Sequence, residues 1–295
     1  MNKKYITLLG LVFISGCTQR PPLDRNSFRN DGTSIRSDSQ VTSPVESVPE
    51  NQRLKNPELI LAAIRGGDAQ VANGEYLAGA ELYKRAYDGN PEVSTLVLMS
   101  RAMRLGGEAQ KSVLTLQSLE KVHGNSQAFL VELARASIAG GYNNDARVAL
   151  EKAIARPDAG WAAYITMGAL QAKTGKSSEA KASFNEAQRR SSTQGEKDAS
   201  LANLAMLEAQ DGRIDVAISM LEPLASKPSA HRKTMATLAV LYGIKGDRTK
   251  YLDIARKSGM TGTEIEMGSR WLDISNSDEI DVKPTVRRST ANHRN

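Results

Sequence analysis

Apolar residues recur every three to four positions from about residue 57 to residue 259, and glycines interrupt this pattern at nearly regular intervals. A period of three to four is that of an amphipathic helix, and few runs of β-branched residues reach the length of a strand. The chain can leave a helix through a left-handed conformation, which glycine adopts readily because it has no Cβ atom. The pattern predicts an all-α chain of about six helix–turn–helix repeats. The interrupting residues follow one another after 33, 34, 34, 37 and 34 positions, and they are Gly74, Gly107, Gly141, Gly175, Gly212 and Gly246.

The stretch from Trp161 to Arg190 shows the repeat most clearly. Two amphipathic segments meet at Gly175, with a small residue, Gly168, in the first segment and an aromatic one, Phe184, in the second. This order resembles the tetratricopeptide repeat (TPR), a unit of about 34 residues. The resemblance implies a TPR-type α-solenoid over residues 57–259, in which no unit can bury its apolar face alone. A compact helical bundle with chance spacing is the alternative.

Two repeats depart from the TPR pattern. The second carries Ser100 and Ser112 where glycine and alanine are expected, and the sixth carries Tyr251 at a position for a small residue. The packing of these two repeats is therefore left open by the sequence.

The beginning of the chain has the features of a membrane anchor. A short basic start precedes an apolar run, Tyr5–Ser15, which is shorter than the about 20 residues that a membrane-spanning helix needs. The run ends in Ile14-Ser15-Gly16-Cys17, which resembles the lipobox of bacterial lipoproteins. The resemblance implies that a signal peptide, residues 1–16, is removed and that Cys17 becomes the diacylated N-terminus, with acyl chains such as palmitate. An ordinary secretory signal with a chance cysteine is the alternative.

The residue after the cysteine bears on the location. Thr18 stands where an aspartate often marks retention in the inner membrane of lipoproteins, so the resemblance implies an outer-membrane anchor that faces the periplasm. Residues 17–56 are rich in polar residues and proline and are expected to be a disordered linker. A capping helix is expected at residues 260–274, followed by a disordered tail at 275–295.

Composition and motifs give no indication of an enzyme. The formal charge of +6 is mild for 295 residues, and acids are interspersed with the bases, so nucleic acid is not an expected partner. One cysteine and three scattered histidines form no metal-binding motif, and no phosphate loop or nucleophile elbow occurs. We therefore expect no catalysis, metal, cofactor or small-molecule substrate.

The TPR resemblance implies that protein partners bind in a groove lined by the first helix of each repeat. Such a groove suits an extended or helical segment with apolar anchors and some negative charge, although its charges could simply keep it soluble. Alignment on the turn glycines places these residues in it: Val97, Arg101, Arg104, Val131, Arg135, Ile138, Ile165, Lys173, Met206 and Gln210.

The fifth and sixth repeats narrow the resemblance further. The fifth repeat contains Asn203-Leu-Ala, then Gly212, then Leu221-Glu-Pro-Leu-Ala. The sixth repeat follows with Leu238-Ala and Gly246-Asp. This order resembles the TadD lipoproteins of tight-adherence (Tad/Flp) pilus assembly over about residues 125–259. The resemblance implies a scaffold that helps the pilus secretin to reach or assemble in the outer membrane. An adaptor for peptidoglycan enzymes and a pilotin of another secretin are the alternatives.

Overall fold

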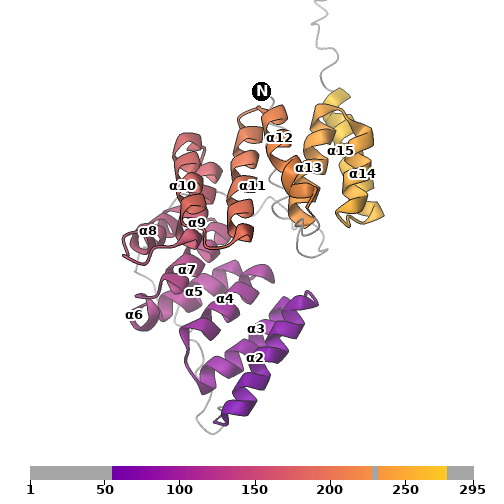
Figure 1. Ribbon diagram of the computed structural model, residues 1–295. Coiled ribbons are helices and arrows are strands. Elements are labelled where there is room, and N and C mark those ends of the chain that lie inside the picture. The colour runs from indigo at the N-terminus through magenta and orange to yellow at the C-terminus, as the bar shows by residue number, and fades with distance from the viewer. Residues whose placement is uncertain (1–54, 228–231, 278–295) are drawn as a thin grey trace, which may run out of the picture. The chain divides into compact units, whose positions relative to one another are not determined.

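The computed structural model describes residues 55–227 and 232–277, and all regular elements in these ranges are helices (Figure 1). The described residues form two compact units, 55–211 and 212–277, which we treat separately. The proposed signal peptide, Cys17, all but the last two residues of the linker, and the tail beyond residue 277 lie outside the described residues.

Residues 55–211 fold into helix pairs that follow the predicted repeats. Second helices pack on the first helix of the next pair: α3 on α4, α5 on α7, α8 on α9 and α10 on α11. Every repeat thereby buries an apolar face that it could not bury alone. The helices of this unit are α2 (Pro57–Ala72), α3 (Tyr76–Gly89), α4 (Val93–Leu105), α5 (Ala109–Ser118), α6 (Glu120–His123), α7 (Gln127–Gly140), α8 (Asn143–Ile154), α9 (Trp161–Lys173), α10 (Ser177–Arg189) and α11 (Gln194–Gln210).

Residues 212–277 form the second unit. Its helices are α12 (Ile214–Ala225), α13 (Arg232–Lys245), α14 (Arg248–Lys257) and α15 (Gly262–Ser277). The pair α13 and α14 is the sixth predicted repeat, and α15 packs on both helices. Leu272 of α15 is buried and lies against Gly243 of α13, where a larger residue would leave it no room.

The six glycines that set the register all occupy the left-handed region, with φ between 79° and 89°. Gly141 shows why the residue is needed: a Cβ atom there would meet nothing within 4 Å, so the constraint is the backbone conformation and not space. The helix–turn–helix register read from the sequence is therefore confirmed.

A second pair of repeat positions couples a small residue to a large one. A Cβ atom on Gly168, seven residues before its turn glycine, would lie 2.5 Å from the ring of Phe184, nine residues after it. The same two positions in the third repeat hold Ala134 and Leu150, both fully buried. The two helices of a repeat cross at these positions. An aromatic ring in the second helix therefore requires glycine in the first helix, whereas the smaller leucine leaves room for alanine.

The two departures from the TPR pattern are accommodated in different ways. Ser100 and Ser112 are fully buried, and their hydroxyl oxygens lie 2.6 Å apart in a hydrogen bond. The Ser112 hydroxyl also lies 3.1 Å from the Ser100 carbonyl, to which it donates. Tyr251 is buried as well, and its hydroxyl donates to the carbonyl of Ile265 in α15 at 3.0 Å. The second repeat therefore packs regularly, and the sixth uses its tyrosine to hold α15.

Candidate protein-binding face

Ten residues were predicted to line a groove, and all of them lie on first helices of the unit formed by residues 55–211. Helix α4 packs on α7, α7 on α9 and α9 on α11, so these four helices form a continuous row. We call the surface of this row that carries the predicted residues the inner face. The row brings residues that are 28, 31 and 35 positions apart in sequence into contact.

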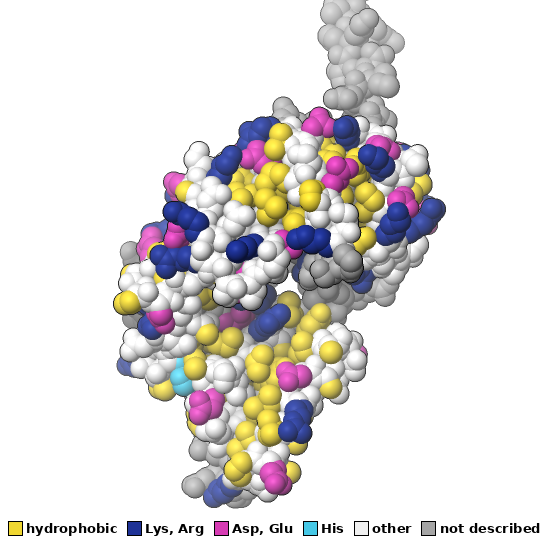
Figure 2. All heavy atoms as spheres, in the orientation of Figure 1, with side chains coloured by type: hydrophobic (Ala, Val, Ile, Leu, Met, Phe, Trp, Pro, Cys, Tyr) yellow, Lys and Arg dark blue, Asp and Glu magenta, His cyan; other side chains and the backbone are white. Residues whose placement is uncertain are grey.

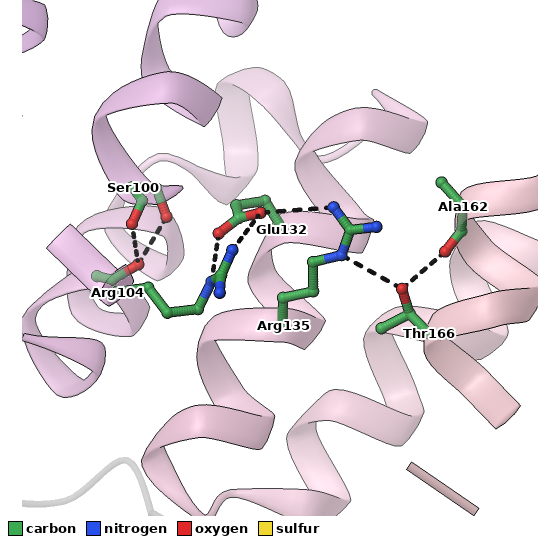
Figure 3. A network of polar contacts seen from close by, with 7 residues as sticks. Ser100, Arg104, Glu132, Arg135, Ala162 and Thr166 are labelled. Carbon is green, nitrogen blue, oxygen red and sulfur yellow. Dashed lines mark hydrogen bonds and ion pairs between the residues drawn. The ribbon is translucent and has the colours of Figure 1, made fainter. Parts of the chain in front are cut away.

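Arg104 of α4 is held by a buried carboxylate of α7 (Figure 3). Its Nε atom donates to Oε1 of Glu132 at 2.8 Å, and its Nη2 atom lies 3.5 Å from Oε2. The Glu132 side chain is only 1% exposed, and 18% of the Arg104 side chain is exposed. Two nearly parallel N–H donors match a carboxylate, and a buried carboxylate without such a partner would be costly. Arg104 is therefore a structural link between the second and third repeats.

Arg135 continues the same network toward α9 (Figure 3). Its Nη1 atom lies 3.9 Å from Oε2 of Glu132, and its Nε atom donates to Oγ1 of Thr166 at 3.3 Å. Thr166 in turn donates to the carbonyl of Ala162 at 2.7 Å. Burial lowers the pKa of Arg135, Glu132 opposes this shift, and the positive charges of Arg104 and Arg101 add to it. The guanidinium stays charged at neutral pH because arginine does not deprotonate in proteins.

Lys173 also has an internal partner. Its Nζ atom donates to the carbonyl of Ile138 at 2.8 Å, in the last turn of α7. The position is favourable for a cation, since the last carbonyls of a helix carry partial negative charge. Burial lowers the pKa of Lys173. This lysine joins the third and fourth repeats.

Arg101 differs from the other three basic residues. It is exposed on α4, one turn before Arg104, and makes no hydrogen bond or ion pair with any residue that the structure describes. Its charge still acts on its surroundings: burial raises the pKa of Tyr83 and lowers that of Arg135, and Arg101 opposes the first shift and adds to the second. Of the predicted basic residues, it is the one most free to meet a partner.

The predicted apolar residues divide into core and surface. Val131, Ile165 and Met206 are 3%, 8% and 6% exposed, so they support the inner face from beneath. Val97, Ile138 and the polar Gln210 are half-buried. Figure 2 shows hydrophobic side chains gathered on the surface over the region of α2, α3 and α4. Hydrophobic side chains also gather over the region of α11 in the same view, so accessible apolar surface is not confined to the first two repeats.

Glu132 and Thr166 belong to the site but were not singled out from the sequence. Glu132 is the only acid in the largely apolar run from Phe129 to Ile138, and that isolation was the available signal. Thr166 gave no signal, because a threonine inside a helix usually bonds back to its own helix, as this one also does.

No group of three or more His, Cys, Asp or Glu side chains in residues 55–227 and 232–277 could hold a metal ion. None of the helices in those ranges is both long and apolar enough to cross a bilayer.

The chain matches no protein-family model and no curated protein sequence. Solved structures do match it. A thermophilic TPR protein of Thermus thermophilus, TTC0263, is 20% identical with a TM-score of 0.55, over 62% of this chain and 98% of that one. The pilF protein of Pseudomonas aeruginosa is 13% identical with a TM-score of 0.51, over 74% and 98%.

A chain of the APC/C hetero-tetramer Cut9–Hcn1 is 15% identical with a TM-score of 0.56, over 76% of this chain and 44% of that one. At these identities the likeness speaks for the fold alone. The predicted fold class is confirmed: the described residues fold as an all-α TPR-type solenoid.

Proposed function

We propose that the chain is a lipid-anchored TPR scaffold that binds protein partners at the outer membrane, on the periplasmic side. We further propose that it serves tight-adherence (Tad/Flp) pilus assembly by helping a secretin to reach or assemble in that membrane. The observation that carries the scaffold role is the row of first helices, whose inner face combines apolar surface with the exposed Arg101. The proposal contains no catalytic step, cofactor or metal.

The pilus role and the location rest on sequence resemblance. The lipobox that ends in Cys17 supports the anchor, and the fifth and sixth repeats support the TadD family. Two acyl chains suffice to hold a protein at a bilayer surface, whereas one is marginal. The 39 residues that follow Cys17 in the linker, 18–56, would reach roughly 30–40 Å as a flexible coil, enough to hold the repeats clear of the membrane.

Replacing the anchor tests the proposal. In a strain that carries Cys17→Ala, we expect the chain to leave the outer-membrane fraction and the secretin to mislocalise, with loss of secretin multimers and pili. Thr18→Asp is the matched variant: it keeps the lipid and should move the chain to the inner membrane.

Three outcomes separate the alternatives. Normal secretin multimers and normal pili with Cys17→Ala would contradict the pilus role. Cell-wall defects with normal pili would favour the adaptor for peptidoglycan enzymes. Loss of a secretin unconnected with Tad pili would favour a pilotin of another system.

A further inference from the structure

Positive charge exceeds negative charge at one end of the inner face. Arg104 and Arg135 both lie beside the carboxylate of Glu132, and Arg101 lies one turn before Arg104 on α4. The buried Glu132 is the only carboxylate with which any of them forms an ion pair in the described part of the chain. Arg104 and Arg135 share that single carboxylate, and Arg101 forms no ion pair with it.

Asp68 on α2, the first helix of the first repeat, does not balance this excess. Asp68 of α2 accepts a hydrogen bond from the Tyr83 hydroxyl at 2.7 Å. Burial raises the pKa of this phenol, Asp68 raises it further and Arg101 opposes the rise, so both charges lie near the phenol. Even with Asp68 included, three positive charges face two negative ones.

We propose that Arg101 and Arg135 bind the side-chain carboxylate of an aspartate or glutamate in a partner protein. This inference rests on the proposed scaffold function and names the chemistry of the segment that the scaffold takes. Arg101 offers its whole guanidinium fork, and Arg135 is already aimed by Thr166 and Glu132, so less side-chain entropy is lost on binding. Arg104 keeps Glu132 occupied and so prevents it from repelling the incoming carboxylate.

The surroundings favour a peptide over a phosphate group or an anionic membrane. Half-buried apolar side chains lie on the same helices, Val97 on α4 and Ile138 on α7, and Ile64 packs nearby against the same core. A segment with apolar residues beside its acid would cover them, in the mode of an extended or helical peptide in a groove. A net excess of one charge suits one carboxylate better than a doubly charged phosphate.

The test is to select peptides that bind the chain and then to compare the affinities of one acidic peptide and its amide form. Random 12-residue peptides displayed with a free N-terminus and a fused C-terminus are selected on the purified full-length chain, so only side-chain carboxylates are offered. We expect enrichment of Asp or Glu next to apolar residues. The best peptide is then labelled, and its affinity is compared with that of its Glu→Gln (or Asp→Asn) form by fluorescence anisotropy. The acidic form should bind about tenfold more tightly, as for a charge-assisted pair.

Variants locate the site. Arg101→Gln should weaken binding of the acidic peptide about tenfold and abolish its advantage over the amide form. It should not disturb folding, because Arg101 has no internal partner among the described residues. Arg135→Lys, which retains the charge but loses the fork, should weaken binding less. Arg147→Gln is the control: Arg147 is exposed on α8, where it pairs with Glu151, and its replacement should leave binding unchanged.

Several results would overturn the site. If the selected peptides are not enriched in acids, or if Arg101→Gln and Arg147→Gln lose the same affinity for the acidic peptide, then Arg101 and Arg135 do not bind its carboxylate. Tighter binding when phosphoserine replaces the acid would assign a phosphate site instead. These failures leave the anchor experiment untouched, since Cys17→Ala reports on location and Arg101→Gln reports on recognition.

Discussion

The clearest quantitative prediction concerns the crossing of α9 and α10. The substitution Gly168→Ala places a Cβ atom 2.5 Å from two carbons of the Phe184 ring, which is 2% exposed and cannot swing into solvent. Overpacking of this kind costs about 1–3 kcal/mol. Alanine in a helix interior is better than glycine by about 1 kcal/mol, which offsets part of that cost. We expect Gly168→Ala to lower the free energy of unfolding by about 1 kcal/mol in the native background.

The effect of Gly168→Ala on the free energy of unfolding should change sign when a smaller side chain replaces the Phe184 ring. In a Phe184→Leu background the two positions resemble Ala134 with Leu150, a pair that is fully buried in the third repeat. The clash is then removed while the helix preference remains, so Gly168→Ala should stabilise that background by about 1 kcal/mol. The coupling between the two substitutions should be about 2 kcal/mol, well beyond the roughly 0.5 kcal/mol scatter of independent sites.

The assay is equilibrium unfolding in urea of the four combinations. Repeat arrays can unfold in parts, so a local probe is needed. A Trp271→Phe background leaves Trp161 as the only tryptophan, at the start of α9, where its indole N–H donates to the Ser200 hydroxyl at 2.9 Å. Stabilisation by Gly168→Ala in both backgrounds, or additive effects, would refute the argument that the ring requires the glycine.

Two further predictions follow from buried polar groups. Ser112→Ala should cost about 1 kcal/mol because it takes away the hydroxyl that pairs with the buried Ser100 hydroxyl, whereas Ser112→Ala with Ser100→Ala should be nearly neutral. A double variant as costly as the sum of the singles in urea unfolding would argue against the paired hydroxyls. The free energy of unfolding should also fall as pH rises above about 10. Buried phenols keep their protons to higher pH in the folded chain than in the unfolded chain. Above that pH the unfolded chain therefore binds fewer protons than the folded chain, and unfolding becomes more favourable. Burial raises the pKa of four of the eight tyrosines, Tyr83, Tyr87, Tyr242 and Tyr251. Phenolate absorbance should therefore show that only some tyrosines titrate before the helices unfold. Titration of all eight tyrosines in the folded state would contradict this prediction.

The fold could be read from the sequence because its signals are local and periodic. A turn glycine such as Gly141 needs a particular backbone conformation, and that requirement depends only on the residues beside it. One turn glycine is a weak signal, but its recurrence about every 34 residues fixes the register of all the repeats. The replacement of Gly and Ala by Ser100 and Ser112 was visible as a departure, but the sequence could not show that their hydroxyls pair, because this depends on how α4 crosses α5.

The site was less accessible because it depends on contacts between repeats. Alignment placed Val131 and Ile165 in the groove, yet both side chains are buried, since the exact rotation of each first helix decides which side of a residue faces outward. The partner of Arg104 lies 28 residues away on another helix. Position within a repeat does not carry that information.

The division among the four basic residues changes how the inner face should be tested. Arg104, Arg135 and Lys173 each bridge two repeats, so replacing them with acids would alter stability and recognition together. Arg104→Glu in particular would set a second carboxylate against the buried Glu132, and an uncompensated buried charge costs about 3–5 kcal/mol. Loss of partner binding in such a variant could arise from unfolding alone. Arg101 has no such bond to break in the described chain, so only there does a change in charge report on the partner rather than on the scaffold.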